Sequence, residues 1–302
     1  MNVRQYPLWT ALVTPLSPDG SVDYATFKKL IGAQEEANNA LLILGSTGES
    51  LNLDDNERRK IVEFTVYLAP KVPIMVGVGG INLKETLNWL SFLEKFPIHA
   101  YLFVVPLYAK PGVLGQYYWF KALLDHATKP CMIYNIPGRC ATPLQFETVG
   151  KLKGHPNFWA IKEASGREAD FKTYKEYAGP TIQIFSGDDA LLPSFVPLGC
   201  AGLVSVAGNA WPKETHAYVK MAMKGATREI KEWIQWSQVL FTASNPVPVK
   251  RLMYEQGQIK SPILRPPLTH EDLADFTPLI KAGQEVRAWF SRSSKEHSHE
   301  QS

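Results

Sequence analysis

The stretch CMIYNIPGRCATPLQFETVGKLKGHPNFWAIK, from Cys131 to Lys162, gives the clearest indication of the fold. It starts with a short apolar run at residues 131–135, continues through residues 143–152 with a helical period, and closes with a second apolar run at residues 158–162. Runs that are apolar at nearly every position are typical of parallel strands covered on both faces. The stretch therefore predicts one strand–helix–strand unit of an α/β fold.

The same alternation continues on both sides of this unit. We predict strands at residues 8–14, 40–45, 73–78, 100–105, 131–135, 158–162, 181–185 and 202–206. Each is followed by a segment whose period is nearer 3.6 than 2, and these predicted helices cover residues 24–37, 55–68, 83–94, 115–126, 143–152, 167–177, 189–196 and 212–223. Eight such units without a break in composition predict a (β/α)8 TIM barrel over residues 1–224, and a doubly wound open sheet is the alternative.

Two further helical segments follow the barrel, at about residues 227–256 and 273–291, with the proline-rich stretch SPILRPP between them. We expect residues 225–291 to form a C-terminal helical extension packed on the barrel. Residues 292–302 are polar, and we expect a disordered tail there. Its closely spaced His297 and His299 are not expected to bind a metal.

The composition excludes several classes of function. Of 302 residues, 45% are hydrophobic and 20% are charged, which suits a compact soluble protein. The formal charge is +3 with dispersed basic residues, so nucleic acid is not an expected partner. The longest apolar stretch, residues 100–109, is about half as long as a membrane helix. We expect no membrane span, and since the proline-rich first twenty residues do not resemble a signal peptide, we expect a cytoplasmic protein.

The cysteines do not indicate a fold stabilised by disulfides or a bound metal. Cys131, Cys140 and Cys200 are an odd number without metal-ligand spacing, which disfavours both a disulfide framework and a zinc site. We therefore expect no metal.

Catalytic groups of a TIM barrel lie at the C-terminal ends of the strands, so these positions are the first candidates for chemistry. Lys162 ends the sixth predicted strand. Burial there would disfavour the ammonium and lower the pKa, and the free amine can attack a carbonyl carbon to form a Schiff base. The alternative for Lys162 is a solvated residue at a strand end.

The fifth predicted strand offers a second pair of candidates, Tyr134 and the nearby Arg139. A phenol at this place could move protons to and from carbinolamine and enamine intermediates, and a guanidinium could hold a carboxylate with two hydrogen bonds. The alternatives are a barrel aromatic with a satisfied hydroxyl and a salt bridge in the loop.

Other strand ends supply further polar groups. The turn LGSTGES at residues 44–50 has hydroxyls and backbone donors that could cradle a carboxylate or phosphate, although it lacks the P-loop pattern and could be a plain loop. Tyr108 follows the fourth strand, and from the residues alone an interface aromatic is the preferred interpretation. Asp188 and Asp189 have no accompanying histidine or third carboxylate, so we expect them to cap the following helix rather than bind a metal.

These strand ends carry a lysine, two tyrosines, a hydroxyl turn and an arginine, the inventory of a metal-free Schiff-base lyase. The sequence resembles the dihydrodipicolinate synthase / N-acetylneuraminate lyase family of class I aldolases from about residue 8 to residue 269. The resemblance rests on six motifs in the same order: ALVTP (11–15), GSTGE (45–49), YNIP (134–137), IKE (161–163), SGDD (186–189) and NPVPVK (245–250).

The resemblance implies a role for several residues. Lys162 would form the Schiff base with pyruvate and Tyr134 would be the proton shuttle, with no cofactor other than this covalent imine. Ser46 would link Tyr134 to Tyr108, which would reach in from a neighbouring subunit. The remaining implied substrate-binding residues are Thr47, for the pyruvate carboxylate, Arg139, for the carboxylate of an aldehyde substrate, and Gly187 and Leu203.

The implied reaction is the condensation of pyruvate with L-aspartate 4-semialdehyde to 4-hydroxy-tetrahydrodipicolinate, a step towards diaminopimelate and lysine, in a homotetramer built from dimers. One alternative is an aldolase that cleaves N-acetylneuraminate or a 2-keto-3-deoxy sugar acid. Arg139 favours the synthases, because the neuraminate lyases usually lack it. A second alternative, an inactive barrel that serves as a binding protein, predicts loss of a core position, whereas Lys162, Tyr134 and Tyr108 are all present.

Three positions depart from the usual synthase pattern. Ser46 stands where synthases usually have threonine, Ala109 where asparagine is frequent, and Gly138 where serine is frequent. These departures concern the second substrate more than the class of chemistry.

The resemblance also bears on regulation. Lysine-sensitive relatives hold lysine at the subunit interface with polar side chains, at positions that align with Leu51, Asp55, Arg58, Ile81, Glu85 and Leu107. Such relatives tend to have asparagine in place of Ile81 and tyrosine in place of Leu107. We therefore expect free lysine not to inhibit this protein strongly.

Overall fold

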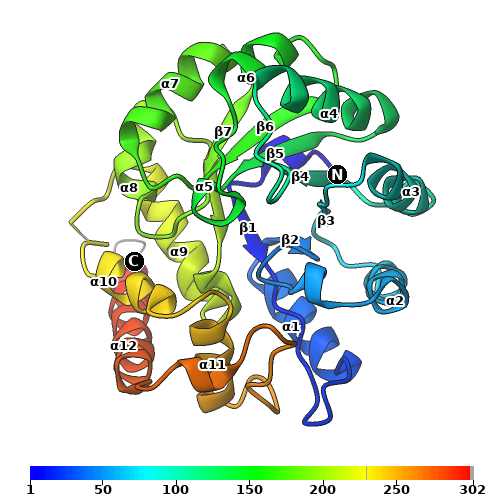
Figure 1. Ribbon diagram of the computed structural model, residues 1–302. Helices are drawn as coiled ribbons and strands as arrows, with labels where there is room; N and C mark the ends of the chain where they lie inside the picture. Colours follow the sequence, from blue (N-terminus) through cyan, green and yellow to red (C-terminus); the bar gives the residue numbers. More distant parts are fainter. Residues whose placement is uncertain (229, 300–302) are drawn as a thin grey trace.

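Eight parallel strands close into a barrel in the computed structural model, which describes residues 1–228 and 230–299 (Figure 1). The strands pair in chain order, and β8 pairs back with β1. They are β1 (Leu8–Ala11), β2 (Ala40–Ile43), β3 (Ile74–Val78), β4 (Ala100–Val104), β5 (Cys131–Asn135), β6 (Phe158–Glu163), β7 (Gln183–Ser186) and β8 (Gly202–Ser205). The predicted (β/α)8 TIM barrel is confirmed, and the open sheet is excluded.

The helices surround the barrel and connect its strands (Figure 1). They are α1 (Tyr24–Glu36), α2 (Asp55–Tyr67), α3 (Leu83–Leu93), α4 (Val113–His126), α6 (Phe146–Leu152), α7 (Glu168–Ala178), α8 (Leu192–Phe195) and α9 (Pro212–Met223). A short additional helix, α5 (Pro137–Cys140), follows β5 and carries Arg139. Short 3-10 turns lie at η1 (Val3–Gln5), η2 (Ser50–Asn52), η3 (Val196–Leu198), η4 (Ala207–Asn209), η5 (Val239–Phe241) and η6 (His270–Asp272).

Local capping explains where the N-terminal helices begin. The Asp54 carboxylate accepts a hydrogen bond from the Glu57 backbone N–H, and the Glu57 side chain accepts one from the Asp54 N–H. This reciprocal capping box satisfies two backbone donors at the start of α2. Asp23 and Asn82 cap α1 and α3 in the simpler one-sided way.

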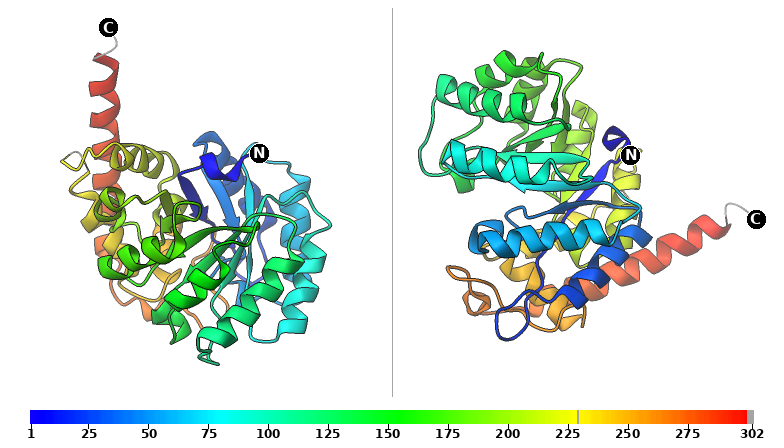
Figure 2. Two further views of the ribbon diagram at one scale, coloured as in Figure 1. Left: turned by 90° about the horizontal axis from the view of Figure 1, so that it is seen from above. Right: turned by 90° about the vertical axis from the view of Figure 1, so that its right-hand side faces the viewer.

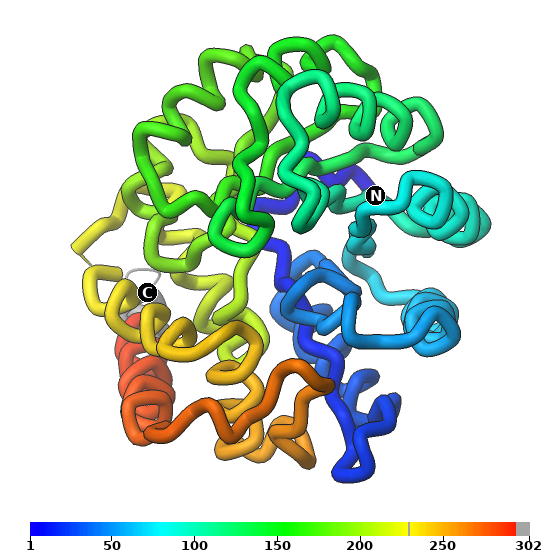
Figure 3. Tube along the Cα trace, in the orientation of Figure 1, coloured from blue at the N-terminus to red at the C-terminus, as the bar shows by residue number. Residues whose placement is uncertain are grey.

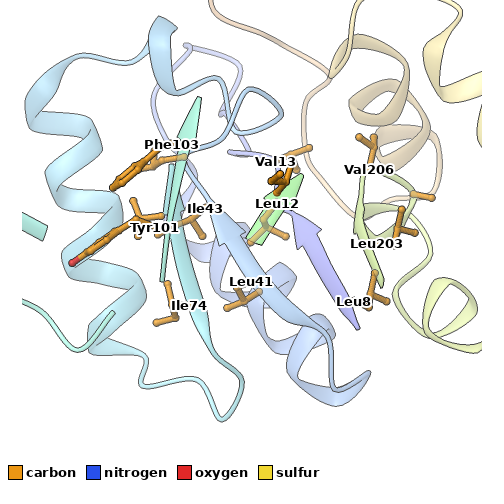
Figure 4. Close-up of a cluster of buried hydrophobic side chains, with 14 of the residues drawn as sticks. Leu8, Leu12, Val13, Leu41, Ile43, Ile74, Tyr101, Phe103, Leu203 and Val206 are labelled. Carbon is orange, nitrogen blue, oxygen red and sulfur yellow. The ribbon is translucent and has the colours of Figure 1, made fainter. Parts of the chain in front are cut away.

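Two apolar layers hold the barrel together. Leu102, Met132 and Trp159 belong to the cluster inside the barrel, whereas Tyr101 and Phe103 belong to the larger cluster between strands and helices (Figure 4). Successive strand residues point to opposite faces, and both faces are buried, which is why the strands read as continuous apolar runs. Since side chains fill the barrel interior, a substrate can bind only beyond the strand ends.

The C-terminal region differs from the prediction in two places. The helix predicted at residues 227–256 is divided into α10 (Trp233–Gln238), the turn η5 and α11 (Val247–Glu255). Pro246 and Pro248 explain the division, because a proline has no N–H to continue a helix but fits the first turn of a new one.

The last helix, α12 (Thr277–His299), extends into the region that we expected to be disordered, so the predicted start of the tail at residue 292 is wrong. Leu279 and Val286 anchor its buried part, and once a helix is nucleated each further residue adds a backbone hydrogen bond. Figure 2 shows the end of α12 extending away from the barrel. Residues 300–302 of the expected tail lie outside the described residues. Among the helices that the structure describes, none has the length and apolarity needed to cross a bilayer.

Candidate active site

A pocket of about 310 Å³ opens at the C-terminal ends of the strands. Its wall is formed by residues near the ends of β3, β4 and β5 and in the loops after β2, β3, β4 and β5. Most of these residues are apolar, and they include Ser46, Gly79, Leu107, Tyr134, Arg139 and Cys140. Three of the expected site residues, Ser46, Tyr134 and Arg139, therefore share one pocket.

Lys162 lies beside this pocket in β6, next to Tyr134 of β5 in the strand register. Its side chain is only 5% exposed, and Nζ lies 4.1 Å from the centre of the Tyr134 ring. Burial lowers the pKa of Lys162 to about 7; the Arg139 charge acts in the same direction, and the Asp189 carboxylate acts against it. About half of the amine is thus neutral near pH 7, the form that can attack a carbonyl carbon.

Gly187, just after β7, gives the Lys162 side chain its space. A Cβ atom at Gly187 would lie 2.9 Å from Cε and 3.1 Å from Cγ of Lys162. Any larger residue would push the lysine out of place. The structure therefore places Gly187 against the lysine, at the position where the sequence predicts a substrate contact.

Tyr134 is buried, and burial raises its pKa to about 12, although the nearby Arg139 charge and a hydrogen bond with Ser46 act in the opposite direction. The phenol is consequently protonated at neutral pH. It can give a proton to an oxygen beside Lys162 and exchange it with the Ser46 hydroxyl.

The hydroxyl turn after β2 is held in an unusual backbone conformation. Leu44 and Glu49 both have φ of +55°, and the turn packs so closely on β3 that a Cβ at Gly77 would lie 2.0 Å from the Leu44 carbonyl oxygen. Ser46 is exposed at the mouth of the pocket, whereas Thr47 is buried.

One residue that sequence reasoning left without a role joins two of the expected binding residues. The Asn245 carbonyl oxygen accepts a hydrogen bond of 2.8 Å from Arg139 Nη2. The Asn245 side chain donates a hydrogen bond of 2.9 Å to Thr47 Oγ1. The motif at residues 245–250 was the available signal, but a motif alone does not show what its side chains touch.

Two expected residues lie elsewhere. Tyr108 is 89% exposed, with φ of +62°, and no hydrogen bond within the described chain joins it to Ser46 or Tyr134. The Leu203 side chain packs with Leu8 between barrel and helices (Figure 4). The Leu203 side chain therefore points outward from β8 and that of Val204 points inward, so a substrate contact of Leu203, which stays a prediction, would not involve its side chain.

The expected helix-capping role of Asp189 is wrong. Its buried carboxylate accepts hydrogen bonds from the Ser205 hydroxyl and from the N–H of Val206, at 2.9 Å. These contacts join the loop after β7 to the end of β8, while α8 begins at Leu192 without a side-chain cap. Within residues 1–228 and 230–299, no three His, Cys, Asp or Glu side chains are grouped as a metal site.

A parallel barrel with a buried low-pKa lysine beside a buried tyrosine is an arrangement suited to an enzyme whose nucleophile is an amine. The model of the Dihydrodipicolinate synthetase family matches residues 6–281, and the chain belongs to this family of cofactor-free class I aldolases. The family resemblance carried by the six motifs is thereby confirmed.

The relatives agree with this assignment. The chain is 46% identical to the 4-hydroxy-tetrahydrodipicolinate synthase of Wolbachia pipientis subsp. Culex pipiens (strain wPip), covering 93% of this chain and 96% of the relative. It is 45% identical to the Francisella philomiragia enzyme of the same name, over 94% of this chain and 97% of that one.

Solved structures also resemble this fold. The chloride-inhibited dihydrodipicolinate synthase of Acinetobacter baumannii, complexed with pyruvate, superposes with a TM-score of 0.88 at 29% identity, over 93% of this chain and 98% of that one. The enzyme from Cyanidioschyzon merolae with lysine bound has a TM-score of 0.87 at 29% identity, over 94% and 98%.

Proposed function

We propose that this protein condenses pyruvate with L-aspartate 4-semialdehyde to 4-hydroxy-tetrahydrodipicolinate, in diaminopimelate and lysine biosynthesis. The observation that carries the proposal is the Lys162 amine, with a pKa of about 7 and 4.1 Å from the Tyr134 ring, at the catalytic end of the barrel. The names of the relatives support both the reaction and the pathway.

The first half of the reaction forms an enamine. The neutral Lys162 amine attacks C2 of pyruvate, and the resulting carbinolamine loses its oxygen as water after Tyr134 supplies a proton. The phenolate then accepts a proton from C3 of the imine, which gives the enamine and restores the phenol. The hydroxyl and backbone donors of Ser46 and Thr47 hold the pyruvate carboxylate.

The second half joins the two substrates. The enamine C3 attacks the aldehyde carbon of the semialdehyde, and the Tyr134 phenol gives its proton to the new alkoxide. The phenolate then takes a proton from the substrate ammonium, and the resulting amine attacks the imine carbon, forms the ring C–N bond and displaces the Lys162 amine. Arg139 in the wall of the pocket binds the carboxylate of the semialdehyde. Gly187, which lies against the Lys162 side chain, and Leu203 are the further substrate contacts of the proposal.

The covalent imine with pyruvate makes a separate cofactor unnecessary. We further propose a cytoplasmic homotetramer built from dimers, in which Tyr108 of one subunit completes the proton relay of its neighbour. Its exposure supports this arrangement, since a tyrosine that is 89% exposed is free to contact a second subunit.

Reduction with borohydride tests the proposal. In the presence of pyruvate, the intact protein should gain the mass of a reduced pyruvate adduct at Lys162, and turnover should follow when the semialdehyde replaces borohydride. Adduct at another lysine contradicts the mechanism. Adduct at Lys162 with turnover of N-acetylneuraminate rather than the semialdehyde contradicts the substrate assignment.

A further inference from the structure

The motif at residues 245–250 has no step in the proposed reaction, yet it contacts the hydroxyl turn after β2 at two points. Asn245 Nδ2 donates to Thr47 Oγ1 at 2.9 Å, and Lys250 Nζ donates to Glu49 Oε1 at 2.8 Å. These partners are 198 and 201 positions apart in the chain. Figure 3 traces the return of the chain after α11 to the N-terminal quarter, where Arg265 Nε donates to the Gly20 carbonyl oxygen.

Asn245 serves the two proposed carboxylate sites through different atoms. Its main-chain carbonyl holds the guanidinium of Arg139, whereas its side-chain amide holds the hydroxyl of Thr47. A substitution of the side chain therefore removes the contact with Thr47 and leaves the acceptor for Arg139 in place.

The direction of the Thr47 bond has a chemical consequence. A threonine hydroxyl has one proton to donate and can accept at its oxygen. Because the Asn245 N–H occupies the oxygen, the hydroxyl proton is left for another acceptor, and no residue in the described part of the chain takes it. A carboxylate only accepts hydrogen bonds, so this proton suits the carboxylate of the first substrate.

Stability of the fold does not by itself explain an amide at this position. Asn245 is only 6% exposed, and its Oδ1 has no hydrogen-bond partner among the described residues. A buried acceptor without a partner destabilises a protein. The useful part of the amide is its N–H, which meets Thr47.

The other end of the turn is fixed independently. Lys250 and Glu49 form an ion pair whose side chains are 0% and 1% exposed. Lys250 also donates to the Thr14 carbonyl, and Glu49 accepts from the Arg265 N–H at 2.8 Å. Since the turn is anchored at Glu49, loss of the Asn245 amide changes the orientation of the Thr47 hydroxyl more than the position of the turn.

We infer that Asn245 is a positioning residue that directs the Thr47 hydroxyl proton toward the carboxylate of pyruvate. The inference rests on the proposed function, which assigns this carboxylate to Thr47. Loss of one such hydrogen bond to a charged group corresponds to roughly a tenfold change in binding.

Asn245→Ala, Thr47→Val and the double variant test the inference. Asn245→Ala should raise about tenfold the pyruvate concentration needed for half-maximal borohydride trapping and the KM for pyruvate, while the KM for the semialdehyde changes less than twofold. Thr47→Val should have a similar effect, and the double variant should be no worse than Thr47→Val. Asn39→Ala is the matched control, because Asn39 is a buried amide that binds Gln34 and the Pro212 carbonyl away from this turn.

Asn245→Asp covers the case in which the alanine variant does not fold. This substitution keeps the size of the side chain, but a carboxylate can only accept hydrogen bonds. Thr47 must then donate its hydroxyl proton to the aspartate, so the KM for pyruvate should rise. In the Thr47→Val background the same substitution should not raise this KM. If Thr47→Val leaves pyruvate trapping unchanged, the proposed role of Thr47 fails. If Thr47→Val weakens trapping while the Asn245 variants do not, or if the two effects add, the inference about Asn245 is overturned.

Discussion

At the scale of single residues, the decisive balance is between the cost of burying the Lys162 ammonium and the charges around it. Burial has the largest effect on the pKa, Asp189 partly opposes it, and Arg139 adds to it. Since the first cause is the packing of β5, β6 and β7 around the side chain, the lowered pKa of this amine is a property of the fold and needs no bound partner.

This balance predicts the pH dependence of imine formation. Below about pH 7 the ammonium cannot attack, so the rate of borohydride trapping at low pyruvate should rise about tenfold per pH unit and level off above pH 7. Asp189→Asn should move the rising part of this pH profile to lower pH, because the Asp189 carboxylate raises the pKa of Lys162. Arg139→Ala should move the rising part to higher pH. A rate that still rises above pH 9 in the unaltered protein would show that the Lys162 amine is solvated.

The same residue should limit stability. In the unfolded chain Lys162 keeps its proton up to about pH 10.4, whereas in the folded protein it loses it near pH 7. Between these values the unfolded state binds more protons, so the stability contribution of Lys162 rises with pH over this window.

Lys162→Met should consequently be inactive but more stable than the unaltered protein by about 2–4 kcal/mol at pH 7, and the difference should shrink toward pH 10. Calorimetric unfolding at both pH values measures this. Equal stability of the two proteins at pH 7 would contradict the depressed pKa.

The sequence allowed the positions of Lys162 and Tyr134 to be predicted, because each stands at the end of an apolar strand whose direction the barrel defines. It did not reveal the contacts of Asn245, which depend on where a segment 198 positions away returns to the barrel. The sequence also does not show which face of β8 the Leu203 side chain occupies, because a shift of one residue in register exchanges the two faces of a strand.

At the scale of elements, α11 is joined to the turn after β2 by the buried Lys250–Glu49 pair. A buried ion pair adds little to the free energy of unfolding compared with apolar residues of similar size in its place. Removal of one partner, however, leaves a buried charge without an opposite charge beside it. The pair therefore makes the C-terminal extension necessary for the shape of the active site.

Lys250→Met should destabilise the protein by about 3–5 kcal/mol, because it leaves the Glu49 carboxylate buried and unpaired. Glu49→Gln in the same chain should restore part of the loss. Thermal unfolding measures both effects. Lys121→Met is the control, since the Lys121–Asp125 pair is exposed and its loss should change little. A loss with Lys250→Met no larger than with the control would contradict this role of the pair.

Elements with a clear apolar pattern were predicted well, among them α9 at residues 212–223, from its helical period, and β5 at residues 131–135, from its continuous apolar run. The division of the segment before α11 was missed, although Pro246 and Pro248 are visible in the sequence, because the helical period continues across them. The full length of α12 was not predicted, because its last residues are polar and have the composition of a disordered tail. The buried residues in the first half of the helix, which anchor it, become known only from the structure.

At the scale of the whole molecule, Tyr108 is exposed, and no hydrogen bond in the described part of the chain joins it to the proposed proton relay of its own subunit. If it completes a neighbouring site, the smallest active unit is a dimer. Tyr108→Phe and Lys162→Ala should each be nearly inactive alone, and a mixture of the two should regain part of the activity, because a mixed dimer contains one site with both residues intact. Mass spectrometry of the mixture verifies subunit exchange. No recovery in mixed dimers that have formed would place Tyr108 outside the relay.

The last prediction concerns another pocket, of about 530 Å³, which includes Asp55, Arg58, Ile81 and Glu85. These are four of the positions at which lysine-sensitive relatives bind lysine. Two observations make the pocket unsuitable for this ligand. The Asp55 carboxylate is already paired with Arg58 at 3.0 Å and with Arg59 at 2.6 Å. Ile81, 58% exposed, offers a hydrocarbon surface in place of a hydrogen bond.

Free lysine carries two ammonium groups and one carboxylate. A site that binds it therefore needs hydrogen-bond acceptors for the ammonium groups and a donor for the carboxylate. Leu107 stands where lysine-sensitive relatives tend to have tyrosine, and it lines the adjoining active-site pocket, which shares Gly79 with this one. Leu107 and Ile81 together remove two hydrogen bonds to the ligand, which should weaken binding about a hundredfold. Initial rates at subsaturating pyruvate should therefore be unchanged by micromolar lysine. Ile81→Asn with Leu107→Tyr should move inhibition toward lower concentrations if these side chains are the missing contacts. Half-inhibition of the unaltered protein in the micromolar range would mean that Glu85 and the arginine-paired Asp55 bind lysine in an arrangement that needs neither residue.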